Sequence, residues 1–115
     1  MARRRRGLIT KAEARAIAAA RIGEHQETPD GVTPVIVDAE TIEREFGWVF
    51  FYQSQEYLLT NSVSDMLLGN APIVVDRDDG TVSTLKTYGS IAEQIEEYSA
   101  EHRRRGVRAR PPRPA

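Results

Sequence analysis

The residues best suited to chemistry in this sequence are the carboxylates of the segment DRDDG, which begins at Asp76. Acidic side chains at alternate positions before a glycine are typical of a calcium loop, in which oxygen ligands surround the ion at fixed spacing. Here the glycine is the fifth residue of the loop rather than the sixth, and the twelfth is Thr87 instead of a glutamate. The segment therefore does not fit an EF-hand, and we expect no metal and no cofactor.

The other candidates for catalysis are two histidines, His25 and His102, which are isolated in the sequence. Neither has a nucleophile and a second base beside it, so a catalytic triad would have to assemble from distant segments. There is no cysteine and no glycine-rich loop that could hold a phosphate. Surface acids are so numerous that pairs of them carry no information about acid–base catalysis. We therefore expect no enzyme and no catalytic residues.

Two helices are expected near the ends of the chain. Thr10 and Glu13 form a capping box, and Gly23 suits the left-handed end of that helix. Ser90 and Glu93 repeat the capping box near the C-terminus. The small side chains expected on one side of the first helix are those of Ala12, Ala16, Ala19 and Ala20. The expected packing face of the last helix carries Ile91, Ile95 and Tyr98, with Arg103, Arg104 and Arg105 in its last turn.

Three β-rich segments lie between these helices, namely PVIVDAE, GWVFFYQS and PIVVDRDDGTVSTL. In the second, Trp48 and Phe50 point to one face and Val49 and Phe51 to the other, so this strand is expected at the centre of a sheet. Asp79-Gly80 predicts a hairpin turn in the third segment. Residues 56–68 fit neither a helix nor a strand clearly, because apolar residues flank a polar, turn-like middle.

The predicted fold class is α+β, with a small antiparallel sheet of about four strands flanked by an N-terminal and a C-terminal helix. Both helices are expected on one face of the sheet. The expected organisation is a disordered basic arm at residues 1–7, a single domain at 8–105 and a disordered Pro/Arg tail at 106–115.

Charge is strongly segregated along the 115 residues, although the net charge is only −1. The two ends are rich in arginine, whereas between Gly7 and Ala100 six basic residues face sixteen acidic ones. An acidic body of this kind can be steered toward a basic partner by long-range electrostatic attraction. The sequence has no apolar run of membrane-spanning length and no signal peptide, so a cytoplasmic protein is expected.

Several landmarks occur in a characteristic order: the aromatic segment FGWVFFY, then LLGNAPIVVDRDDGTV, and then a final helix that starts after a glycine and ends in EEY. This order resembles the small bacterial YrhB-like family, also called the immunity protein 35 family, over residues 35–98. The residues that match its pattern include Trp48, Phe50, Gly69, Asn70, Pro72 and Gly80, and Gly47 and Tyr52 match as well. The segment KTYGS departs from the glycine-threonine step that is common in this family.

The resemblance implies an antidote that binds a cognate protein toxin domain and neutralises it, with a basic nuclease as one such toxin. We expect partner binding by an acidic rim, defined as Glu43, Glu45, Asp76 and Asp78, which alternatively is only a solvated face. Tyr52 and Tyr57 are candidate interface anchors. The alternation of the aromatic strand instead favours a core role for most of its rings, with Trp48 beneath one of the helices.

Two other functions remain open at this point. The family name also attaches to a proposed heat-shock chaperone, which would need an exposed apolar groove. The arginine-rich ends could bind nucleic acid through its phosphates, although the acidic body would repel the same ligand.

Overall fold

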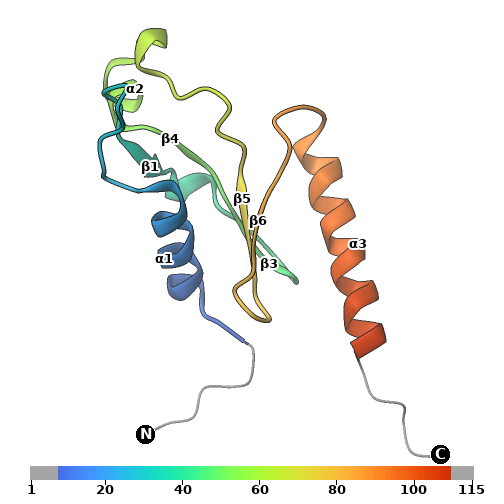
Figure 1. Cartoon of the computed structure of the whole chain (residues 1–115). Coiled ribbons are helices and arrows are strands. Elements are labelled where there is room, and N and C mark those ends of the chain that lie inside the picture. The colour runs from blue at the N-terminus through green and yellow to red at the C-terminus, as the bar shows by residue number, and fades with distance from the viewer. Residues whose placement is uncertain (1–7, 110–115) are drawn as a thin grey trace, which may run out of the picture.

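The structure is a computed structural model that describes residues 8–109 (Figure 1). The expected arm at residues 1–7 and the end of the expected tail, from residue 110, lie outside the described residues. The helices are α1 (Lys11–Ile22), α2 (Gln55–Thr60) and α3 (Ile91–Ala109), with 3-10 turns η1 (Asp38–Glu40) and η2 (Val63–Asp65). The strands are β1 (Pro34–Ile36), β2 (Ile42–Arg44), β3 (Gly47–Phe50), β4 (Tyr52–Ser54), β5 (Ile73–Asp76) and β6 (Val82–Thr84). Within residues 8–109, no helix combines the length and the apolar composition needed to cross a membrane.

The strands form two antiparallel sheets. The larger has the order β2-β3-β5-β6, and β1 and β4 form the smaller. Gly47 pairs with Asp76 and Phe50 pairs with Ile73, so the larger sheet has a Gly47 end and a Phe50 end. The predicted α+β class, with a small antiparallel sheet flanked by the two terminal helices, is therefore confirmed.

The two helices lie on opposite faces of the larger sheet, not on one face as expected (Figure 1). On one face, Trp48 and Phe50 pack with residues of α1. On the other face, Val49 and Val74 pack with Ile95 of α3. This arrangement follows from β3, whose side chains are apolar on both faces. Each face must therefore be covered by another element that keeps these side chains out of water.

The segment GWVFFYQS forms two strands rather than the single strand expected. The chain leaves the larger sheet after Phe50, and from Tyr52 onward it pairs with β1. Phe51 lies between these two strands, and its carbonyl accepts a 2.8 Å hydrogen bond from the Val37 N–H. The ambiguous segment that follows forms α2 and η2.

Helix α1 begins and ends as the sequence predicts, but it packs through other alanines. Both halves of the Thr10–Glu13 capping box are present, and Gly23 is left-handed with φ of 68°. The fully buried alanines are Ala14 and Ala18. The expected face is wrong at Ala12, Ala16 and Ala20, which are exposed. Ile17 and Ile22 pack with the Ala14 and Ala18 face, so the apolar side of α1 follows the isoleucines.

Helix α3 packs through Ile91, Ile95 and Tyr98, as the spacing predicts. Ser90 caps its first turn by accepting a hydrogen bond from the Glu93 N–H. The helix continues to Ala109, past the boundary expected at residue 105, so the three arginines 103–105 precede its last turn. The third expected segment forms the β5–β6 hairpin, in which Gly80 is left-handed with φ of 77°.

A charged network fixes α1 to the segment around β1. Arg15 donates hydrogen bonds to both oxygens of Glu24, at 2.9 and 3.0 Å, and to both oxygens of Asp38, at 2.7 and 3.1 Å. Burial alone would raise the pKa of Glu24, but the hydrogen bonds from Arg15 and from the Ile36 N–H outweigh it and keep this pKa below its ordinary value. Hydrogen bonds from Arg15 likewise lower the pKa of Asp38.

We expect Arg15→Met to weaken the dependence of stability on acidic pH. A carboxylate whose pKa is lower in the folded chain stabilises the fold above its unfolded pKa, about 4, and this contribution is lost as pH falls toward the folded pKa. The wild type should therefore lose more stability than the variant between about pH 5 and pH 3. The measurement is urea unfolding at several pH values in this window. Arg21→Met, on the same helix, is the control and should retain the wild-type pH dependence, whereas equal dependence in all three proteins would exclude this role of Arg15.

Candidate functional site

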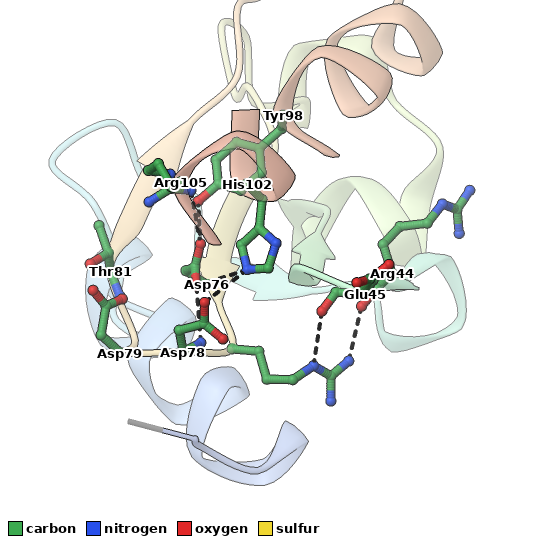
Figure 2. Close-up of polar contacts among 10 residues, drawn as sticks. Arg44, Glu45, Asp76, Asp78, Asp79, Thr81, Tyr98, His102 and Arg105 are labelled. Atoms are coloured by element: carbon green, nitrogen blue, oxygen red, sulfur yellow. Dashed lines mark hydrogen bonds and ion pairs between the residues drawn. The ribbon is translucent and has the colours of Figure 1, made fainter. Parts of the chain in front are cut away.

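The residues of the expected acidic rim gather at the Gly47 end of the larger sheet. Glu43 is in β2, Glu45 is in the turn to β3, Asp76 is the last residue of β5, and Asp78 lies in the β5–β6 turn. The antiparallel pairing of β3 with β5 places Gly47 opposite Asp76, which brings the two turns together. Helix α3 passes the same end and contributes Tyr98, His102 and Arg105 (Figure 2).

Asp76 is not an exposed member of the rim, so this part of the expectation is wrong. The residue is 1% exposed, and its carboxylate lies between the β5–β6 turn and α3. Oδ1 accepts a 2.9 Å hydrogen bond from the Asp78 N–H, and Oδ2 accepts one of 3.0 Å from the Tyr98 hydroxyl and one of 3.3 Å from Arg105. The carboxylate can be buried because a charge is tolerated inside a protein when it is paired. Its contacts with Tyr98 and Arg105 hold α3 against the sheet.

His102 lies beside the rim and was missed from the sequence, where this histidine is isolated. Its Nε2 lies 2.9 Å from Oδ2 of Asp78 and 3.9 Å from Oδ1 of Asp76. Helical spacing could have indicated this position, since His102 follows Tyr98 by four residues and therefore lies on the same face of α3.

Asp76, Asp78 and His102 could each offer one ligand atom to a metal ion, and these atoms lie within 4.8 Å of one another. One oxygen of Asp76 already accepts from Tyr98 and Arg105, and the guanidinium supplies the positive charge that an ion would supply. Asp76 and Arg105 therefore form an ion pair in this cluster, whereas Asp78 is exposed.

Arg77 engages a second acid of the rim. Its Nη2 lies 3.1 Å from Glu43 and its guanidinium stacks 4.4 Å from the centroid of the Trp48 ring. It also donates to the backbone carbonyls of Arg44 and Glu45. The hydrogen bond from Arg77 lowers the pKa of Glu43. The exposed acids of the rim are therefore Glu43, Glu45 and Asp78, and two of these three have a basic side chain within ion-pair distance.

The two candidate tyrosine anchors lie away from the rim. Tyr52 follows the Phe50 end of β3, Tyr57 is in α2, and both are half-buried. The structure therefore does not gather the six expected partner-binding residues into one surface. Four of them lie at the Gly47 end of the sheet and two near its Phe50 end.

The motif residues around the third segment have structural contacts. The side chain of Asn70 donates a 2.7 Å hydrogen bond to the Tyr52 carbonyl, and Gly69 is left-handed with φ of 70°. Pro72 immediately precedes β5, and its carbonyl accepts from the Leu85 N–H. The strand that follows Pro72, β5, is central in the larger sheet, because it pairs on both sides, with β3 and with β6.

The fold and this end of the sheet define the class of the molecule as a small α+β protein with a central antiparallel sheet between two helices. A model of the Immunity protein 35 family matches residues 12–101, from the first turn of α1 well into α3. The chain therefore belongs to the Immunity protein 35 family, as the segments FGWVFFY and LLGNAPIVVDRDDGTV indicated. It is also 32% identical over 71 residues to the uncharacterized protein YrhB of Escherichia coli (strain K12), a match that covers 60% of this chain and 72% of YrhB. No solved structure gave a significant match.

Proposed function

We propose that this protein is an antidote that neutralises a bacterial toxin domain by binding it directly, without catalysis and in the cytoplasm. The observation that carries the proposal is the match to the Immunity protein 35 family over residues 12–101, which includes the whole sheet and parts of both covering helices. We further propose that the toxin has a basic surface, as nucleases do. Between Gly7 and Ala100 the chain has six basic and sixteen acidic residues, and this acidic body attracts a basic partner.

The exposed acids of the rim contribute to the field in which such a toxin approaches. Glu43, Glu45 and Asp78 remain accessible, although Arg77 and His102 lie beside two of them. Long-range attraction acts mainly on the association rate and weakens as salt screens it. We therefore propose a role for these residues in steering the toxin.

The test of this function is rescue from a defined toxin. The first step is to read the genes beside the one for this chain, and the probe is the C-terminal domain of a large protein found to be encoded there. When expression of this toxin domain is induced, bacterial growth should stop, and co-expression of this chain should restore it. The two purified proteins should form a complex. If growth stays arrested while both proteins are present and folded, the antidote function is excluded.

A chaperone is the second candidate, because the structure exposes large apolar side chains at Leu58, Leu59, Val63 and Leu68. A chaperone would bind many unfolded proteins through such residues. The discriminating measurement is the aggregation of several unrelated heat-denatured proteins in the presence of this chain. If this chain suppresses their aggregation and does not bind the toxin domain, its function is that of a chaperone and not of an antidote.

A further inference from the structure

A groove lies at the Phe50 end of the sheet, away from the acidic rim. It has a volume of about 400 Å³. The side chains that give it an apolar and aromatic lining are Phe51, Tyr52, Tyr57, Leu58, Pro72 and Ile91. These residues come from β4, α2, the first residue of α3 and the segments beside β4 and β5, so the groove forms only in the folded chain. Concave sites with an apolar lining and a few polar groups are the usual form of binding sites.

The segment beside this groove exposes unusually apolar side chains. Among the described residues, five large hydrophobic side chains are exposed, and four of them lie between residues 58 and 68. Leu58, at 50% exposure, lines the groove, and Leu59 follows it at 78%. Single exposed leucines are ordinary, but their concentration in one segment indicates a contact surface.

Hydrogen bonds hold this segment in place although its leucines point outward. The Gln53 side-chain oxygen accepts a 2.6 Å hydrogen bond from the Leu67 N–H, and Asn70 donates to the carbonyl of Tyr52. The Ser54 hydroxyl caps α2 by accepting from the Tyr57 N–H. The surface is therefore ordered before any partner arrives, which lowers the entropy cost of binding.

The charge of the groove favours a basic partner. Glu40 is the charged residue in the lining, it is exposed, and within residues 8–106 its side chain makes no hydrogen bond or ion pair. An aliphatic and aromatic surface next to an unpaired carboxylate fits a protein segment that carries a large apolar side chain beside a lysine or arginine.

We propose that this groove is the surface on which the toxin domain docks, a proposal that rests on the antidote function. The occupant is a segment of the toxin that places one large apolar side chain against Tyr52, Tyr57 and Leu58. A lysine or arginine of the same segment pairs with Glu40. The acidic rim then sets the association rate of the toxin, and the groove sets its dissociation rate.

The experiment compares the kinetics of binding to the purified toxin domain for two sets of variants. Leu58→Ser and Glu40→Gln alter the groove, whereas the triple variant Glu43→Ser, Glu45→Ser and Asp78→Ser alters the rim. Leu58→Ser is expected to raise the dissociation rate about tenfold or more, as truncation of a central anchor does. The rim variant is expected to slow association at low salt and to leave the dissociation rate unchanged.

Matched controls separate a local effect from a loss of fold. Glu96→Gln, on the exposed side of α3, removes the same charge as Glu40→Gln and should leave dissociation unchanged. Each of these variants should melt within about 3 °C of the wild type, because surface substitutions rarely change stability further.

The outcomes also distinguish this proposal from the antidote function itself. If wild-type protein rescues growth and both groove variants keep the wild-type dissociation rate, the groove is excluded and the antidote function stands. If the chain alone forms a dimer that Leu58→Ser dissociates, a second copy covers the groove and the toxin does not. If wild-type protein neither binds the toxin domain nor rescues growth, the antidote function fails before the groove is tested.

Discussion

Replacing Trp48 with alanine is expected to lower the free energy of unfolding by about 3–5 kcal/mol. The Trp48 side chain is 1% exposed and packs with Ala14 and Ala18 of α1, and the Arg77 guanidinium stacks on its ring. Truncation leaves a cavity that the alanines of α1 are too small to fill. For a domain of this size, the loss corresponds to a fall in melting temperature of more than about 10 °C.

Thermal and urea unfolding of Trp48→Ala measure this effect, with Trp48→Phe as the graded control. The phenylalanine retains much of the buried apolar area and should lie between the alanine variant and the wild type. A melting temperature of Trp48→Ala equal to that of the wild type would contradict the burial of this ring between α1 and β3.

Replacing Gly47 with alanine is expected to cost at least about 3 kcal/mol, because two unfavourable effects coincide. Gly47 has φ of 143°, a conformation that side chains other than glycine rarely adopt. A Cβ at this position would also overlap the carbonyl oxygen of Val75 and crowd the backbone nitrogen of Arg77. The neighbour is backbone of the central strand β5, so it cannot move aside as a flexible side chain would.

Gly69→Ala is the matched control for this substitution. Gly69 also has positive φ, at 70°, but nothing lies within 4 Å of a Cβ built there. Its substitution should cost only the left-handed backbone conformation, about 1–2 kcal/mol. The measurement is urea unfolding of both variants. If they lose the same free energy of unfolding, the close approach of β3 to β5 adds nothing to the cost of the substitution at Gly47.

Much of the candidate site could not be read from the sequence, because it depends on contacts between distant segments. The acidic pattern of DRDDG identifies Asp76 and Asp78 as a pair of carboxylates, but not that one is buried and the other exposed. That difference arises when α3 brings Tyr98 and Arg105 over Asp76. Similarly, Tyr52 and Tyr57 were candidates by residue type alone. Pro72 and Ile91, which line the groove with them, come later in the chain, after η2.

The local elements of this protein can be predicted from its sequence, since each depends on residues close together in the chain. The capping box of Thr10 and Glu13, the left-handed Gly23 and the Asp79-Gly80 hairpin all occur where their patterns predict them. Packing between distant segments selects the face through which each helix is buried. The alanine spacing on α1 fits several faces equally, and packing against Trp48 and Phe50 selects Ala14 and Ala18. It also decided where the strand GWVFFYQS breaks, because pairing with β5 up to Phe50 and with β1 from Tyr52 involves partners that are distant in sequence.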